Sequence, residues 1–332
     1  MKQHFISTQD ISAWQAALEP LAFSFYHTAE HCKAMEQAHG HPIFLYHLQH
    51  KDQSIVCPYA IREYQGKKDV YTPLGFAGFS GSVNIQNWYM HWHDFMKQQG
   101  FLAAYTFLHP IFQRKLQLSS NTILHAEKPI HIINLMQPQS RLLNNMHAHH
   151  QRNLKKWFKQ KYYISTDKQI LLPEFINLFR ITCREFDMPS IYHFNDKVLH
   201  QLLNNPNVLL IGVSDNQHTT PKAIISIVKS PYIADFFLTA CTLDSRYHSL
   251  ALLWHAILYC KQLNIPYFNL SGGAIDKPGL DLFKRRLGGK ILLTYSMREI
   301  FNPATYQDLC YQRGTRTDSE QYFPAYHQRQ NH

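Results

Sequence analysis

The sequence has no uninterrupted run of about 18 apolar residues, although 45% of its residues are hydrophobic, so a transmembrane helix is not expected. The first ten residues, MKQHFISTQD, contain no apolar core of the kind that a secretory signal needs. None of the six cysteines lies in a C-x-x-C pair, so neither a disulfide framework nor a zinc ribbon is indicated. These absences predict a cytoplasmic protein with buried thiols.

Nucleotide-binding and metal-binding fingerprints are also missing. The chain contains no P-loop, no dinucleotide-binding fingerprint, no serine elbow and no H-E-x-x-H sequence. Histidines cluster at positions 91–93 and 147–150, but no third ligand accompanies either cluster. The sequence therefore predicts no metal site.

Acidic residues are scarce, because 33 Lys and Arg oppose 23 Asp and Glu and give a net charge of +10. This excess favours anionic partners, namely nucleotides, phosphorylated lipids, membrane surfaces or RNA, with a basic protein that has no such partner as the alternative. The stretch 140–161 predicts one amphipathic helix whose cationic residues are Arg152, Lys155, Lys156, Lys159 and Lys161. Like charges at this spacing repel one another, so we expect the face to serve an anion or a membrane surface; a merely solvated face is the alternative.

The length of 332 residues and the order of the patterns indicate two lobes that meet near Pro138. Strand and helix patterns occur on both sides of this proline. We predict an α+β protein with a first lobe at 1–137, a second lobe at 138–314 and a polar C-terminal tail at 315–332. Each lobe should contain a mixed, mostly antiparallel sheet flanked by helices.

The stretch 267–290 combines a strand, a glycine turn and a cationic helix. Residues 267–270 alternate as a strand does, and Ser-Gly-Gly at 271–273 ends it. In the following helix, Leu280, Phe283 and Leu287 are spaced to face inward, and Lys284 projects beside two arginines. Strand ends of this kind often form ligand sites in α/β folds, so we predict a site here. The alternative is a structural unit with a solvated basic face.

A second glycine-rich stretch, 69–81, contains three glycines, a proline and three aromatic residues. Glycines permit close backbone approach, and aromatic rings offer stacking faces. This combination predicts a pocket wall that includes Tyr71, Gly75 and Gly78. An aromatic-rich structural turn is the alternative.

These motifs together resemble FemAB-type transferases, which are relatives of the GNAT acyltransferase superfamily. The family pattern "GL..FK..FG" stands here as Gly279-Leu280, Phe283-Lys284 and Leu287-Gly288, with Leu287 in place of the usual aromatic. The stretch 69–81 resembles the family's "SPYGYGGP" loop, and the basic helix resembles its "R..I.KA.K.G" helix. The resemblance implies a chain of two GNAT-like lobes.

The resemblance also implies an activity, the transfer of an acyl or aminoacyl group to an amine of a cell-envelope or nucleotide-linked precursor. The co-substrate would be acyl-CoA or aminoacyl-tRNA, with no permanently bound cofactor. The acceptor would be a small-molecule or lipid-linked anion, and tRNA or an anionic membrane would be a further partner. The alternative is a degenerate GNAT-like protein that binds an anionic membrane or RNA without catalysis.

Roles for individual residues follow from the same resemblance. Lys284 would be the partner of an oxyanion or carboxylate, and Asp235 would be a base. Arg152 and Lys156 would bind phosphate groups. The residues expected to line the acceptor pocket are Tyr71, Gly75 and Gly78.

The donor would bind at the turn before the helix that starts near residue 250. GNAT enzymes hold the diphosphate of coenzyme A on free backbone N–H groups at such a helix start. We therefore expect Arg246, Ser249 and Ala251 to contact the donor. In the GNAT pattern Q/R-x-x-G-x-G/A, which stands here as residues 246–251, Ser249 takes the place of the first glycine; this restricts backbone approach and weakens the case for coenzyme A.

Overall fold

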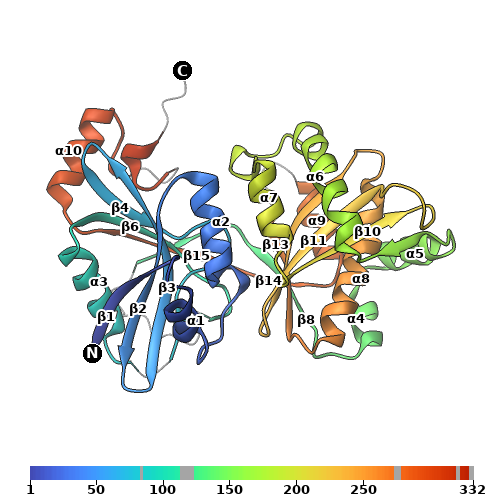
Figure 1. Cartoon of the computed structure of the whole chain (residues 1–332), viewed down its shortest axis with the longest axis horizontal. Helices are drawn as coiled ribbons and strands as arrows, with labels where there is room; N and C mark the ends of the chain where they lie inside the picture. Colours follow the sequence, from blue (N-terminus) through green and yellow to red (C-terminus); the bar gives the residue numbers. More distant parts are fainter. Residues whose placement is uncertain (83–84, 113–122, 273–277, 319–321, 329–332) are drawn as a thin grey trace. The chain divides into compact units, whose positions relative to one another are not determined.

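The computed structural model describes residues 1–82, 85–112, 123–272, 278–318 and 322–328. The chain forms two compact units, one made of Met1–Glu127 together with Leu293–His332, the other of Lys128–Leu292. Figure 1 shows this discontinuity by colour, because the red helix α10 (Pro303–Arg313) accompanies the blue and teal strands of the first unit.

The first unit is built on a sheet in which all described neighbours but one pair antiparallel. Its strand order is β1-β2-β3-β4-β6-β15-β7, with β5 paired to β3, and β4 runs parallel to β6. The strands are β1 (Lys2–Ser7), β2 (Ile43–His50), β3 (Gln53–Tyr64), β4 (Lys67–Tyr71), β5 (Ser80–Gly81), β6 (Phe101–Phe107), β7 (Leu124–Ala126) and β15 (Tyr295–Ile300).

Helices close the core of the first unit. They are α1 (Ile11–Leu18), α2 (Ala29–His39), α3 (Trp88–Gln98) and α10, with 3-10 turns η1 (Phe25–His27) and η5 (Ala325–His327). Helix α3 buries Trp88, Trp92 and Met96, which recur every four residues and so share one face. The Trp92 ring stacks on Tyr59 of β3, which fixes this helix on the sheet.

The second unit is built on a mixed sheet of the order β14-β8-β13-β12-β11-β10-β9. Only β12 and β13 pair in parallel among its described strands; the other neighbours are antiparallel. The strands are β8 (Ile130–Asn134), β9 (Tyr163–Ser165), β10 (Val208–Ser214), β11 (Ala223–Lys229), β12 (Ala234–Cys241), β13 (Tyr267–Gly272) and β14 (Lys290–Leu292). Two mixed, mostly antiparallel sheets therefore confirm the predicted α+β class.

The helices of the second unit are α4 (Gln139–Asn145), α5 (Ala148–Phe158), α6 (Lys168–Glu185), α7 (Asp196–Leu203), α8 (Ser249–Gln262) and α9 (Pro278–Arg286), with 3-10 turns η3 (Ser190–Tyr192) and η4 (Arg246–His248). Helix α8 is apolar around most of its circumference, and it is buried accordingly. Its side chains belong to one core cluster with β11, β12, β13 and α9. This cluster anchors the elements of the candidate site.

The units depart from the expected boundaries of 137 and 138. Strand β8, expected as the last strand of the first lobe, pairs with β13 and β14 of the second unit. Strand β15, expected in the second lobe, pairs with β6 and β7 of the first. A strand's local pattern specifies which face it buries but not which sheet it joins, so the crossing could not be deduced from the sequence.

Residues 322–328 pack against the first unit, in contrast to the expected polar tail. The Tyr326 hydroxyl donates to Oδ2 of the buried Asp69 at 3.1 Å, and His327 Nε2 lies 2.6 Å from the same oxygen. Arg62 Nη2 contacts the other carboxylate oxygen at 2.7 Å. Because a buried carboxylate requires such partners, this segment completes the first unit.

The expected single helix at 140–161 is two helices. Helix α4 ends at Asn145, and α5 begins at Ala148. Between them Met146 is extended, and Nδ1 of His147 accepts the His149 N–H at 3.2 Å as a cap. A histidine at this position gives no strong stop signal in the sequence, which explains the difference.

Candidate functional site

The parallel strands β12 and β13 separate shortly after they begin to pair. Their register joins Ala234 to Phe268 and Asp235 to Asn269 and continues no further. Ser271 lies just beyond this point with a φ of +62°, an unusual backbone conformation for a residue with a side chain. Its hydroxyl donates to the Phe236 carbonyl at 3.1 Å and so bridges the diverging strands. Strain of this kind is often found at functional sites.

Lys284 lies in the second unit beside this divergence. Helix α9 is anchored by Leu287 and Phe283, which pack in the core cluster as the sequence predicts. Lys284 itself is only 4% exposed, and its Nζ donates to the Gly272 carbonyl at 2.7 Å. The same Nζ lies 5.8 Å from the centre of the Phe236 ring. The ammonium is therefore held at the end of β13, although Gly273 of the expected glycine turn lies outside the described residues.

Burial changes the acid–base behaviour of Lys284. Desolvation lowers the pKa of its ammonium from 10.5 to about 8, and the nearby Asp281 carboxylate opposes part of that change. Asp281 accepts from Arg285 at 2.8 Å and lies 2.9 Å from Nε2 of the buried His131. The hydrogen bond from His131 is the largest cause of a lowered Asp281 pKa. The His131–Asp281 pair could not be predicted from the sequence, because the two residues are far apart in the chain.

Asp235 is fully buried, at the last position where β12 pairs with β13. Asn269 donates its side-chain N–H to Oδ1 of Asp235 at 2.7 Å, and the Asn269 oxygen accepts the Ser271 N–H at 2.8 Å. Burial raises the pKa of the Asp235 carboxyl to about 7. Its second oxygen, Oδ2, has no hydrogen-bond partner in the part of the chain that the structure describes.

Lys284 and Asp235 lie on opposite faces of β12. Ala234 and Phe236 both pack with the core cluster under α8, and successive side chains of a strand alternate between its faces. Asp235 therefore points away from the face on which Lys284 approaches the Phe236 ring. The two predicted catalytic residues are near one another along the sheet but do not face one another.

The predicted donor turn is more tightly wound than the family pattern implies. Residues 246–248 form a 3-10 turn that continues into α8, so the His248 N–H donates to Ser245 and the Ser249 N–H to Arg246. Arg246 is exposed, Ser249 is half-buried and Ala251 is buried in the core. Two N–H groups that a diphosphate would need are already used inside the turn.

Arg152 and Lys156 lie on α5 and are exposed. In the described part of the chain neither forms an ion pair. Together with Lys155 and Lys159 they form a face that we call the α5 basic face. It belongs to the same unit as Lys284.

The predicted pocket-wall residues lie in the first unit and contact neighbouring parts of the protein; they are Tyr71, Gly75 and Gly78. The Tyr71 hydroxyl bonds to His41 Nδ1 at 2.8 Å. Gly75 has a φ of +116°, and a side chain there would overlap with the Tyr26 ring; one at Gly78 would overlap with the backbone at Phe107. Close packing thus accounts for both glycines, and their place in an acceptor pocket stays a prediction.

Histidines that the sequence analysis did not select hold this loop. His27 Nε2 lies 2.8 Å from the Gly78 carbonyl, and His31 Nε2 lies 2.8 Å from the Leu74 carbonyl. Burial lowers the pKa of both imidazoles to about 4, so they are neutral at pH 7. Their role in the loop is therefore structural.

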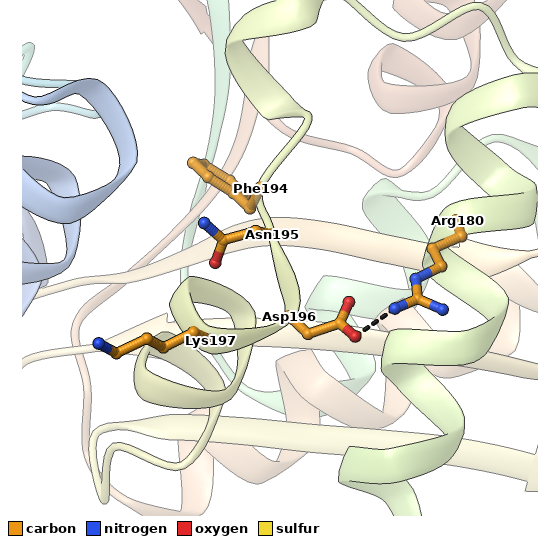
Figure 2. A pocket seen from close by; sticks show the side chains of 5 residues that line it. All are labelled: Arg180, Phe194, Asn195, Asp196 and Lys197. Atoms are coloured by element: carbon orange, nitrogen blue, oxygen red, sulfur yellow. Dashed lines mark hydrogen bonds and ion pairs between the residues drawn. The ribbon is translucent and has the colours of Figure 1, made fainter.

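A shallow pocket lies at the start of α7 (Figure 2). It is lined by Arg180, Phe194, Asn195, Asp196 and Lys197, and Arg180 pairs with Asp196 across it. Asn195 also caps α7 through Oδ1. None of the predicted site residues lines this pocket, so we assign it no role.

No protein-family model and no curated protein matches the chain. In the described residues, no helix has the length and apolar character needed to cross a membrane.

Solved structures do resemble it. The structure of FemX superposes with a TM-score of 0.65 at 11% sequence identity, over 92% of this chain and 99% of that one. The C-terminal domain of a putative lysylphosphatidylglycerol synthetase from Agrobacterium fabrum superposes with a TM-score of 0.58 at 10% sequence identity. The match covers 90% of this chain and 93% of that one. L-PGS from Bacillus licheniformis superposes with a TM-score of 0.55 at 12% sequence identity, over 90% of this chain and 95% of that one. The chain therefore shares the fold of FemX and of these two proteins, as the resemblance to FemAB-type transferases predicted.

Proposed function

We propose that the chain is an acyltransferase that attaches an acyl or aminoacyl group to an amine of an anionic, lipid-linked or nucleotide-linked acceptor. The observation that carries the proposal is the buried ammonium of Lys284, fixed at the divergence of β12 and β13. The fold supports the reaction class, since one protein of this fold is named for joining a lysyl group to phosphatidylglycerol.

The proposed reaction follows from general acyl-transfer chemistry. The acceptor nitrogen attacks the carbonyl carbon of an activated ester or thioester and forms a C–N bond. The C–O or C–S bond to the leaving group then breaks, and the proton lost by the amine goes to that group. Negative charge develops on the carbonyl oxygen in between, where a fixed donor is most effective.

Lys284 fits the position of that donor. With a pKa of about 8 its side chain is mostly charged at pH 7. One of its three N–H groups contacts Gly272, and within the described residues no protein partner takes the other two, which could donate to a ligand oxygen. Because little water reaches the site, a hydrogen bond from the ammonium is stronger there than at the surface.

Asp235 has a different role in this proposal. Since it points to the opposite face from Phe236, it is not placed to accept a proton from a substrate beside Lys284. Its hydrogen bond to Asn269, which in turn holds the Ser271 N–H, instead supports the strained end of β13. We therefore propose Lys284 as the catalytic residue and Asp235 as a positioning residue.

The turn at residues 246–251 bears on the choice of donor. Its engaged N–H groups disfavour a bound diphosphate, so we propose an aminoacyl ester on tRNA ahead of acyl-CoA. Calorimetry with coenzyme A on wild type and Arg246→Ala separates the two. Heat of binding that is lost in Arg246→Ala would instead place coenzyme A at this turn.

Activity is tested by screening aminoacyl-tRNA and acyl-CoA donors for release of tRNA or thiol. Lys284→Ala should lose roughly 10²–10³ in rate, the range for removal of one oxyanion donor. Arg286→Ala, on the same helix, is the matched control and should lose much less. If Lys284→Ala turns over within a few-fold of wild type, Lys284 is not the oxyanion donor.

A second candidate is a non-catalytic protein that binds an anionic surface. The closed 3-10 turn favours it, because that turn departs from a functioning coenzyme A site. One experimental result distinguishes the acyltransferase from the non-catalytic protein. A purified protein that releases nothing from any donor, yet binds anions through α5, would support the non-catalytic role.

A further inference from the structure

The α5 basic face lies directly opposite the buried side of its helix. Helix α5 buries His150, Leu154 and Trp157. At about 100° per residue, Arg152, Lys155, Lys156 and Lys159 fall within an arc of about 100° centred on the side away from these residues. All four are exposed. The helix therefore presents a continuous cationic ridge, and Figure 1 shows α5 at the outer edge of its own unit.

Within the described residues, no acidic side chain pairs with this ridge. From Lys128 to Thr166 the sequence contains no Asp or Glu. In the described part of the chain, none of the four cationic residues forms an ion pair. Like charges this close destabilise an isolated helix, so the fold tolerates a repulsion that an anionic partner would relieve.

An apolar edge borders the ridge on the side of α8. Phe158 is 46% exposed, and its ring lies 5.7 Å from that of His255 on α8. Tyr259, one helical turn further, is also exposed. Burial lowers the pKa of His255, which keeps this edge uncharged.

These features favour a lipid surface over RNA. The exposed cations attract anionic head groups, and the exposed Phe158 ring beside them can enter the membrane interface, although the apolar face of α5 itself is buried in the protein core. Three of the four cations are lysines, which act as point charges toward a diffuse anionic surface, whereas bidentate phosphate recognition in RNA favours arginine. The sequence analysis left both partners open.

We propose that the α5 basic face, with Phe158 at its edge, docks the protein on the surface of a bilayer that contains anionic phospholipids. The lysines would lie among the phosphate groups, and the Phe158 ring would enter the boundary between head groups and acyl chains. Docking would bring the second unit to a lipid-linked acceptor. The docking itself does not rest on the acyl-transfer proposal, since it is measured without turnover.

The test is co-sedimentation of the full chain with vesicles of phosphatidylcholine, alone or mixed with phosphatidylglycerol, at physiological salt. Wild type should bind the mixed vesicles only, and added salt should weaken binding. Lys155→Glu with Lys159→Glu should reduce partitioning at least about 30-fold, because each basic residue near such a surface contributes a factor of about five. Phe158→Ala should reduce it about fivefold through lost apolar burial.

The matched control is Lys67→Glu with Lys68→Glu on β4, which makes the same change in net charge at two exposed lysines of the first unit. It should bind like wild type. An equal loss in both double variants would mean that net charge alone drives binding and would overturn the proposal. So would unchanged partitioning of Phe158→Ala, or tRNA binding that depends on Lys155 and Lys159 while vesicles are not bound. Circular dichroism confirms that each variant is folded.

Discussion

Replacing Lys284 by methionine should make the protein more stable while removing the proposed catalytic group. The pKa of Lys284 falls from 10.5 to about 8 in the folded state because its charge is desolvated. At about 1.4 kcal/mol per pKa unit, this shift corresponds to about 3 kcal/mol against the charged form. Methionine fills a similar volume without charge but loses the hydrogen bond to Gly272. We therefore expect the free energy of unfolding to rise by roughly 1–3 kcal/mol at pH 7.

The pH dependence gives the sharper test. Between pH 8 and 10.5 the unfolded chain holds a proton on Lys284 that the folded chain has lost, so the stability of wild type rises with pH in this window. The difference between wild type and Lys284→Met should therefore be largest below pH 8 and shrink toward pH 10.5. Urea unfolding of both proteins, followed by tryptophan fluorescence at several pH values, measures it. Lys155→Met, at an exposed site, is the control and should show no such trend. A difference that does not change with pH, or a less stable Lys284→Met, would refute the reasoning.

Three further outcomes are expected in the first unit. Because the pKa of His27 falls from 6.5 to about 4 on folding, stability should decline as pH drops through this window, and His27→Gln should flatten that decline in acid-unfolding curves. Gly75→Ala should lower the free energy of unfolding by about 3 kcal/mol or more, because the new side chain would overlap with the Tyr26 ring at a position of positive φ. Gly40→Ala, where the new side chain would meet open space, should lower it by only about 1 kcal/mol, and thermal unfolding measures both changes. Asp69→Asn should lower the free energy of unfolding, measured in urea, by about 3 kcal/mol or more, because it breaks a buried charge network. It should also speed proteolysis of residues 322–328; unchanged cleavage would contradict the role of Asp69 in holding this segment.

The sequence predicted the local elements around Lys284 well. The spacing of Leu280, Phe283 and Leu287 specified which face of α9 is buried, and two of these residues join the core cluster. Leu280 is instead 40% exposed, in the first turn of α9. The fold class followed from the same periodicities, and the solved structures of the same fold confirm it.

The orientation of the candidate site residues depends on tertiary contacts, which sequence periodicity does not reveal. A lysine in an amphipathic helix is usually exposed, and nothing in the sequence shows that Lys284 turns inward to Gly272. Asp235 and Phe236 must point to opposite faces of β12, but no local pattern specifies that Lys284 approaches the face of Phe236. Gly75 is required by the ring of Tyr26 and Gly78 by the backbone near Phe107, both distant in sequence.

The discontinuous first unit determines the order in which the protein can fold during its synthesis. Strand β15 pairs with both β6 and β7, so that sheet stays incomplete until residues near 300 have left the ribosome. The second unit is continuous, and its two ends are joined by the pairing of Leu292 with Ile130. At 5–20 residues per second, its whole length is translated within roughly ten to thirty seconds, before β15 emerges. The unit that carries Lys284 is therefore the first to be complete, and the N-terminal sheet must wait for it with an unpaired edge on β6 exposed to chaperones or to aggregation.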